Sequence, residues 1–367
     1  MDDTHDESLS RRPLRGRGAL SNRAGRYLPR ETSSVDDGWG SAARARSEDT
    51  RPATSVTPER TRSILARNDS PDIFFDRSIN PYKGCEHGCV YCFARSTHAY
   101  LDLSPGLDFE TRLFSKPEAA VRLREELARP SYRPAVIAIG TNTDPYQPAE
   151  RELRITRSVL EVLDECSHPA ALVTKSRGIL RDLDLLTSLA ERSLVRVMFS
   201  VTTLDPDLAR RLEPRASMPA ARLEAMHRLH EAGVPVGVLV SPVIPALTDT
   251  EVEAVLEQAA AAGARWASTI LLRLPREVAD LFDEWLAEHE PDRRDHVLSL
   301  LRQAHGGDLY RSEFGHRGRG AGPWAEMLRR RFEVAARRFG LGTERDAELR
   351  TDLFRRPLDR GGQLGLF

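Results

Sequence analysis

Short apolar runs alternate with longer amphipathic stretches along most of the chain, between about residue 72 and residue 274. Runs of this kind are typical of strands that are buried on both faces of a sheet. They occupy residues 135–140, 170–175, 195–201, 234–242 and 267–274, and an opening strand is expected within residues 76–82. The stretches between them predict helices. Residues 149–166 are an example, in which Val159, Leu163 and Cys166 fall on one face.

Six strands separated by single helices favour parallel pairing with right-handed crossovers. The expected fold class is therefore α/β, either a partial (β/α)6 TIM-like barrel or a doubly wound sheet, and we expect the partial barrel. We place this core domain in residues 67–290. Residues 1–66 are rich in Arg, Ser, Gly and Asp and predict a disordered extension, and residues 291–367 predict a helical C-terminal extension with a short tail.

Polar residues gather directly after the predicted strands. They lie in residues 141–150, 174–176, 200–205 and 241–245. Barrels of parallel strands place their chemistry at the carboxyl ends of the strands. We therefore expect the functional site at this end of the barrel.

The composition favours neither a membrane protein nor a secreted one. Of the 367 residues 40% are hydrophobic and 30% charged, and no apolar run approaches the roughly 20 residues that span a bilayer. The first residues lack the apolar segment of a secretory signal, so we expect a cytoplasmic protein with no membrane partner. The formal net charge is -1, and among the 54 basic side chains only Lys83, Lys116 and Lys175 are lysines.

Three of the four cysteines lie within eight residues. Cys85, Cys89 and Cys92 form a C-x3-C-x2-C pattern directly after the first predicted strand. Three thiolates on one short loop can hold three corners of a four-iron, four-sulfur (4Fe-4S) cluster and leave one iron open for catalysis. Gly84 and Gly88 suit a loop that must fold closely around such a group.

Structural zinc is the competing interpretation of these cysteines. Zinc needs four protein ligands, and His87 and His98 are near in sequence. The chain lacks the two ligand pairs that structural zinc sites usually have, and Cys166 lies on the apolar face of its helix. We therefore expect an iron–sulfur cluster.

The sequence around the cysteines resembles the radical S-adenosylmethionine (SAM) enzymes. The stretches SINPYKGCEHGCVYCFAR, TDPYQPAE, VTKS and FSVTTLD are similar to the branch related to spore photoproduct lyase, over about residues 60–340. The resemblance implies a six-stranded partial barrel with a 4Fe-4S cluster and SAM at the strand ends. It also implies an electron donor of the flavodoxin or ferredoxin class and a 5′-deoxyadenosyl radical that abstracts hydrogen from a substrate.

The resemblance assigns SAM contacts to six side chains: Tyr91, Phe93, Thr143, Asp144, Lys175 and Ser200. The two aromatic residues flank the third cysteine and are expected against the adenine. The next two follow the second strand, where relatives present polar groups to the methionine end. The lysine is a compact point charge suited to a bound carboxylate. Glu213 is left open between holding the ribose and bracing a loop.

The substrate is not named by the sequence. In the photoproduct lyase family a cysteine after the second strand returns a hydrogen atom to the substrate, and Thr141 stands at that place here. We therefore do not expect repair by that route. The branch resemblance and two arginine-rich regions, residues 11–30 and 311–360, still favour a nucleic-acid partner. The alternative function is a non-catalytic iron–sulfur or zinc protein that binds nucleic acid.

The last residues suggest a second partner. They are Gln363, Leu364, Gly365, Leu366 and Phe367. This sequence resembles the short peptide by which bacterial proteins dock on the DNA sliding clamp, an extended segment with apolar anchors. The alternative is a tail that folds back on the barrel.

Overall fold

A computed structural model describes residues 13–27, 52–343 and 348–357. The strands are β1 Ser55–Pro58, β2 Leu65–Arg67, β3 Arg77–Ile79, β4 Tyr82–Lys83, β5 Arg112–Ser115, β6 Ile137–Ile139, β7 Ala170–Thr174, β8 Val195–Ser200, β9 Val236–Val243, β10 Trp266–Leu271 and β11 Gly342–Thr343. The α-helices are α2 Asp108–Thr111, α3 Ala119–Ala128, α4 Glu150–Leu153, α5 Ile155–Glu165, α6 Leu183–Glu191, α7 Pro206–Leu212, α8 Pro219–Glu231, α9 Val252–Ala261, α10 Glu277–His289, α11 Pro291–Ala304 and α12 Gly322–Arg338. Three 3-10 helices are η1 Phe93–Leu101, η2 Arg177–Asp182 and η3 Asp249–Glu251.

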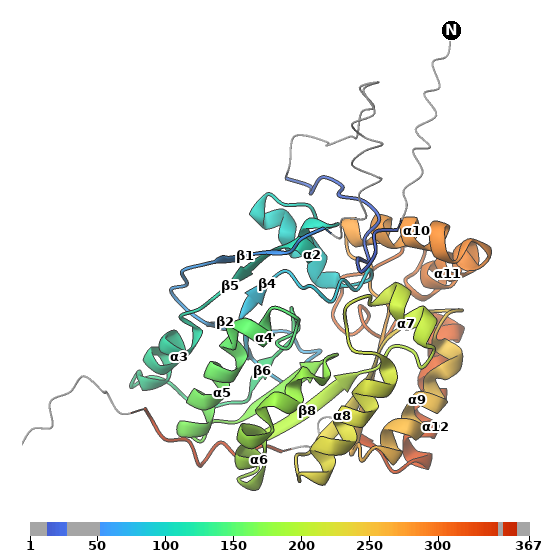
Figure 1. The fold of residues 1–367 in the computed structure, drawn as a ribbon. Coiled ribbons are helices and arrows are strands. Elements are labelled where there is room, and N and C mark those ends of the chain that lie inside the picture. Colours follow the sequence, from blue (N-terminus) through green and yellow to red (C-terminus); the bar gives the residue numbers. More distant parts are fainter. Residues whose placement is uncertain (1–12, 28–51, 344–347, 358–367) are drawn as a thin grey trace, which may run out of the picture.

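The main sheet has the strand order β11-β10-β9-β8-β7-β6-β3-β2. Every neighbouring pair in it is parallel except β2 with β3. Helices cover the outer face of the sheet (Figure 1). The six predicted strands correspond to β3 and β6 to β10, and the α/β fold matches a partial barrel. The two end strands of this sheet do not pair with each other in the described part of the chain.

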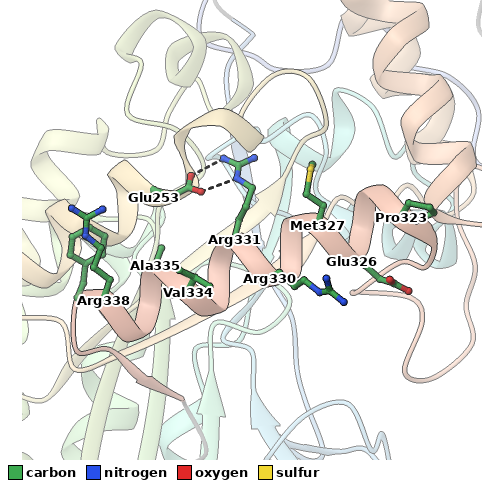
Figure 2. A pocket seen from close by; sticks show the side chains of 10 residues that line it. Glu253, Pro323, Glu326, Met327, Arg330, Arg331, Val334, Ala335 and Arg338 are labelled. Atoms are coloured by element: carbon green, nitrogen blue, oxygen red, sulfur yellow. Dashed lines mark hydrogen bonds and ion pairs between the residues drawn. The ribbon is translucent and has the colours of Figure 1, made fainter.

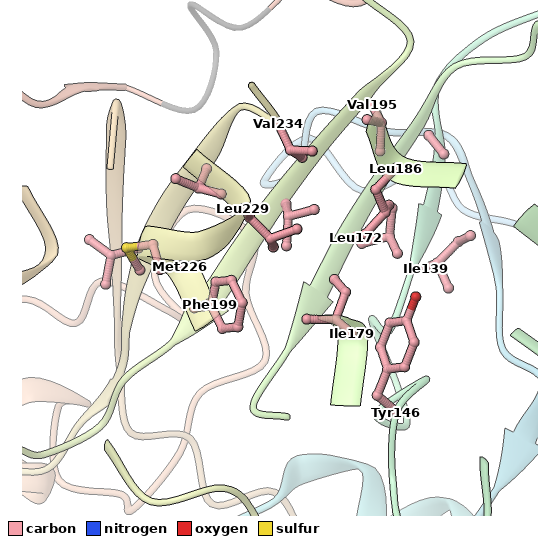
Figure 3. Packing of buried hydrophobic residues seen from close by; sticks show 14 of the residues in the cluster. Ile139, Tyr146, Leu172, Ile179, Leu186, Val195, Phe199, Met226, Leu229 and Val234 are labelled. Carbon is pink, nitrogen blue, oxygen red and sulfur yellow. The ribbon is translucent and has the colours of Figure 1, made fainter. Parts of the chain in front are cut away.

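The main core lies between the central strands and the helices outside them. All six residues of β8 are buried, including Arg196 and Ser200 within its otherwise apolar run, as expected for a central strand. Figure 3 shows Leu172 of β7 facing Leu186 of α6, and Phe199 of β8 beside Met226 and Leu229 of α8. Their tight packing fixes the strands, and with them the residues that follow each strand.

The helix expected within residues 149–166 is interrupted. It consists of α4 and α5, which are separated by Arg154 in the left-handed conformation (φ 50°). The buried Glu150 carboxylate accepts hydrogen bonds from the main-chain N–H groups of Ile155 (3.1 Å) and Thr156 (3.0 Å). Glu150, at the start of α4, thus binds the N–H groups at the start of α5 that have no partner within the helix. The chain can therefore turn at Arg154 without leaving these N–H groups unbonded.

The prediction that all of residues 1–66 are disordered is wrong for two stretches. Residues 52–66 contain β1, which pairs with β5 in a small sheet of order β1-β5-β4. Residues 13–27, which we call the strap, lie against η1 and α2, and Arg17, Gly18, Ala19 and Leu20 are buried. Hydrogen bonds to the buried Glu110 carboxylate hold the strap, and such bonds need no apolar periodicity.

The C-terminal part forms a helical layer, as expected. Helix α12 packs on α9 and α11, and α10 packs on α11 and η1. After β11, residues 348–357 run along the barrel, where Phe354 contacts the rings of Tyr132 and His168. The proposed clamp-binding segment, residues 363–367, lies outside the described residues. Among the helices that the structure describes, none has the length and apolarity to cross a membrane.

Candidate metal and cofactor site

The three cysteines lie in a loop, residues 84–92, that follows β4. Cys85 and Cys89 are buried and Cys92 is half-buried. Gly84 and Gly88 have positive φ values of 76° and 67°, as expected for a loop that turns sharply. A second apolar core, built mainly from α10 and α11, packs against the part of the loop around Cys89. The cysteine loop is therefore a fixed part of the fold.

A fully buried ion pair holds the cysteine loop from one side. The Arg95 guanidinium donates to the main-chain carbonyls of Gly88 (3.0 Å) and Cys89 (2.8 Å). Its partner is the Glu110 carboxylate on α2. The same carboxylate accepts from the main-chain N–H groups of Gly18 and the residue after it, at 3.0 and 2.9 Å. One buried carboxylate thus joins the strap to the arginine that shapes the loop.

The turn after α7 holds the loop from another side. The N–H of Val90 donates to the carbonyl of Leu212 at 3.1 Å, and the N–H of Arg215 donates to the carbonyl of His87 at 3.2 Å. The Arg215 side chain also pairs with Glu86 at 2.9 Å. This turn joins α7 to α8 within the segment that follows β8, so it links the loop to the strand ends.

The three thiols fit an iron–sulfur cluster. Burial raises the pKa of all three, and the charges of Cys89 and Cys92 further raise the pKa of Cys85, so the thiols lie within electrostatic range of one another. A cationic metal group would favour their thiolate forms, which bind iron. In residues 13–27, 52–343 and 348–357, no three His, Cys, Asp or Glu side chains converge closely enough to hold a single metal ion.

A cluster of buried polar groups lies next to the loop, at the ends of β7, β8 and β9. Lys175 Nζ donates to Ser200 Oγ (2.5 Å) and Thr202 Oγ1 (3.3 Å) and lies 3.2 Å from a Glu213 oxygen. It also lies 5.7 Å from the centroid of the Tyr91 ring. Predicted SAM contacts from three separate segments, Tyr91, Lys175 and Ser200, thus come together.

Glu213 is the acidic member of this cluster. It accepts hydrogen bonds from Tyr91 Oη and from Thr202 Oγ1, and it pairs with Arg222 of α8. Burial alone would raise its pKa, but the Arg222 guanidinium and the Lys175 ammonium hold the pKa of this carboxyl well below its usual range. Glu213 is therefore ionised and joins Tyr91, Thr202 and Arg222 within the cluster.

Arg222 and Thr202 are members of the cluster that the sequence pattern did not single out. Arg222 is fully buried, donates to the carbonyl of Ser200 at 2.9 Å and neutralises Glu213. In the sequence it is one arginine among many on an ordinary helix. Thr202 lies in residues 200–205, the polar stretch that follows a predicted strand. This position at a strand end is the sequence feature from which Thr202 could have been predicted as a site residue.

Asp144 adjoins the cluster through the main chain of Lys175. Its carboxylate accepts from the N–H of Lys175 at 2.7 Å and from Thr174 Oγ1 at 2.8 Å, and His87 Nδ1 lies 3.4 Å away. Burial opposes ionisation, but His87 and the main-chain donors lower the pKa of Asp144. This carboxylate therefore connects the second and third strands to the cysteine loop.

The other two predicted SAM contacts lie outside the polar cluster. Thr143 is buried, and its hydroxyl donates to the carbonyl of Tyr82 at 3.2 Å. Phe93 is 38% exposed, and its ring lies under the Arg273 guanidinium at 4.5 Å. The structure thus brings four of the six residues together and places these two at its margins.

Several arginines of the two basic regions are engaged with carboxylates. In the strap, Arg23 pairs with Glu284 and Arg26 with Glu277, both on α10. On α12, Arg331 pairs with Glu253 of α9 at 2.7 Å (Figure 2). This helix lines a surface groove of about 590 Å³ that contains none of the cysteines. Part of the arginine content of these two regions therefore forms ion pairs within the fold.

Comparisons with known proteins identify relatives of this chain. A sequence model of the radical SAM superfamily matches residues 79–259. An uncharacterised protein of Mycobacterium tuberculosis is 39% identical over 231 residues, which is 62% of this chain and 68% of that protein. An uncharacterised protein of Methanocaldococcus jannaschii is 27% identical over 176 residues, 47% of this chain and 62% of that protein.

Solved structures of spore photoproduct lyase variants share the fold. One of them has a TM-score of 0.58 at 15% identity, and the match covers 86% of this chain and 87% of the lyase chain. Another, with bound AdoMet and dinucleoside spore photoproduct, has a TM-score of 0.57 at 15% identity and covers 78% and 80%. From β3 to α9 the superfamily match spans the cysteine loop and the lysine cluster alike, and this chain belongs to the radical SAM superfamily.

Proposed function

We propose that this protein is a radical SAM enzyme that abstracts a hydrogen atom from its substrate. Cys85, Cys89 and Cys92 would hold a 4Fe-4S cluster. When bound, the cluster and SAM supply the electron and the 5′-deoxyadenosyl radical for this chemistry. The observation that carries the proposal is the position of the three thiols, beside a buried polar cluster at the carboxyl ends of parallel strands.

The charges of this cluster support SAM as its ligand. Lys175 and Arg222 share a single carboxylate, Glu213, so these three groups together carry one excess positive charge, and Lys175 among them is half-buried. An excess charge in a largely buried place is costly, and the site therefore favours an anion. The methionine carboxylate of SAM would supply it. Hydrogen bonds to Ser200 and Thr202 hold the lysine ammonium in position.

The remaining predicted residues keep their proposed roles. Tyr91 is oriented by its hydrogen bonds to Glu213 and Thr202, which fixes the ring that we expect near the adenine. Phe93, which directly follows Cys92, is exposed enough to meet a ligand. Thr143 and Asp144 stay candidates for the methionine end, because both lie directly after β6.

We further propose nucleic acid as the substrate class. Support comes from the shared fold, since one neighbour is solved with a dinucleoside photoproduct. The position after β6 that carries a thiol in that family is Thr141 here, so we propose no thiol-mediated hydrogen return. A flavodoxin- or ferredoxin-class protein would be the electron donor, which fits a cytoplasmic enzyme.

Anaerobic reconstitution with iron and sulfide tests the catalytic proposal. After reduction with dithionite in the presence of SAM, we expect 5′-deoxyadenosine by liquid chromatography and mass spectrometry. The Cys89→Ala variant should lose both the iron and the product, because two thiolates remain where three are needed. Cys166→Ala is the matched control, since this buried cysteine ends α5 in the main core, and it should keep both.

Two outcomes would contradict the proposal. A wild-type protein that loads iron but forms no deoxyadenosine would indicate a non-catalytic iron–sulfur protein. A protein that binds zinc and refuses iron under the same conditions would overturn the assignment of the cysteines.

A further inference from the structure

Arg273 lies just beyond the end of β10, beside the third cysteine. Its guanidinium carbon is 4.5 Å from the centroid of the Phe93 ring, and Phe93 directly follows Cys92. The charge of Cys92 acts on this arginine. Arg273 is therefore next to the place where the cluster would be bound.

The Arg273 side chain is half-buried and lacks a carboxylate of its own. In the described ranges of the chain it makes no ion pair and no hydrogen bond. Its neighbour Arg317, in contrast, pairs with Asp72 at 2.7 Å and donates to Ser70 at 2.5 Å. Burial lowers the pKa of Arg273, and so does the positive charge of Arg317, whereas Tyr310, Cys92 and Asp72 oppose this effect.

This arginine lies at a seam between the two ends of the main sheet. The N–H of Gly315 donates to the Asp72 carboxylate at 2.7 Å, and the N–H of Leu271 donates to the carbonyl of Gly318 at 2.8 Å. Loops, and not paired strands, thus meet at the seam. Phe93 is 38% exposed and Phe314 is 54% exposed, so this region is accessible to a ligand.

We propose that Arg273 binds a phosphate group of the substrate, an oligonucleotide, at this seam. Two guanidinium groups with one carboxylate between them leave a positive charge, and a planar guanidinium can hold phosphate through two parallel hydrogen bonds. The Phe314 ring stacks with Arg317 at 4.8 Å and offers a surface for a base. Arginine beside exposed aromatic rings is typical of single-strand binding sites.

The inference rests on the proposed function, because a substrate phosphate at Arg273 lies next to the cysteine loop where the radical would form. It adds a residue that touches the proposed nucleic-acid substrate. A carboxylate-bearing peptide would satisfy the charge equally, but it would make less use of the exposed ring. A pure charge-balancing role toward the cluster is the other outcome that an experiment must separate.

Fluorescence anisotropy with a fluorescein-labelled, ten-nucleotide single-stranded DNA of mixed sequence tests the proposal on the reconstituted full-length protein. We expect Arg273→Gln to raise the Kd about tenfold or more, and the slope of log K against log salt to fall by about 1. Arg273→Lys should recover part of the affinity. Arg276→Gln is the matched control, an exposed arginine three residues away, and it should stay within about twofold of wild type.

Several results would overturn the inference. They are a wild-type protein that does not bind the oligonucleotide, an Arg273→Gln variant with wild-type affinity, and an equal loss in Arg276→Gln. An Arg273-dependent affinity for poly-glutamate but not for DNA would assign the site to acidic peptides. A shifted cluster reduction potential with unchanged DNA affinity would assign Arg273 to the cluster. Deoxyadenosine formation by the wild type, measured without DNA, tests the proposed function separately.

Discussion

The strap packs so closely on the cysteine loop at Gly18 that one added methyl group should destabilise this contact strongly. A Cβ placed on Gly18 would lie 1.9 Å from the carbonyl oxygen of Gly88, in the cysteine loop, and 3.3 Å from the main-chain nitrogen of Val90. Since ordinary contact begins at 3.4 Å, Gly18→Ala must push the strap away by about 1.5 Å. Both neighbouring groups are main chain, so no side-chain rotation can relieve the clash.

This displacement breaks two hydrogen bonds to a buried carboxylate. Gly18 and Ala19 donate their N–H groups to Glu110 at 3.0 and 2.9 Å, and a shift of this size takes both beyond bonding distance. Each hydrogen bond to a charged group contributes about 1.5–3 kcal/mol. A loss of about 3 kcal/mol at the lower limit increases the population of the open strap about 100-fold.

Native-state proteolysis measures this population. Trypsin cleaves after Arg17 only when the strap opens, because Arg17 is 6% exposed and its guanidinium donates to the Glu110 carbonyl at 2.8 Å. Cleavage of a transiently open segment follows its population. We expect Gly18→Ala to raise the rate at this bond about 100-fold, as measured by mass spectrometry of the fragments.

Gly16→Ala is the control for strain without a clash. Gly16 has φ 76°, but no atom lies within 4 Å of the position that an added methyl group would take, so only the left-handed conformation is penalised, by about 1–2 kcal/mol. Equal rates for wild type and Gly18→Ala would refute the reasoning. So would a Gly16→Ala effect as large as that of Gly18→Ala, because strain and not the contact with the loop would then control the strap.

Two further predictions concern SAM and pH. Lys175→Arg should weaken SAM binding about tenfold or more in equilibrium dialysis, because a planar guanidinium cannot occupy the compact ammonium site. Lys116→Arg is the control and should change SAM binding little. Equal losses of SAM affinity in the two variants would contradict the proposed role of Lys175. Burial lowers the pKa of His168 to about 4, so below pH 6.5 the unfolded chain takes up a proton that the folded protein does not. The free energy of unfolding in urea should therefore fall by about 2 kcal/mol from pH 7 to pH 5, and His168→Gln should lack this part. An unchanged pH dependence in that variant would assign the effect to other groups.

The barrel was predictable because its strands are buried on both faces. The run at β8 is entirely apolar apart from Arg196 and Ser200, and such runs in alternation with helices permit few other arrangements. The cysteine loop was predictable from spacing alone. Lys175 and Ser200 could be placed together because each stands at a strand end, where parallel strands bring distant segments to one edge.

The remaining features depend on contacts that leave no pattern in the sequence. The strap is held by main-chain N–H groups that bind Glu110, and every residue except proline supplies such a group. Arg222 differs from the other arginines only because Glu213 lies buried beside it. The break at Arg154 depends on the Glu150 side chain turning to the start of the next helix, a choice that periodicity does not encode.

The contacts that shape the cysteine loop have a consequence for how its sequence can change. Arg95 binds the carbonyls of Gly88 and Cys89, and the turn at Leu212 binds the N–H of Val90. Side chains between the cysteines add to these contacts, since Glu86 pairs with Arg215, His87 lies beside Asp144 and Tyr91 donates to Glu213. A substitution in the loop would therefore change the immediate surroundings of a bound group and the path of the main chain together.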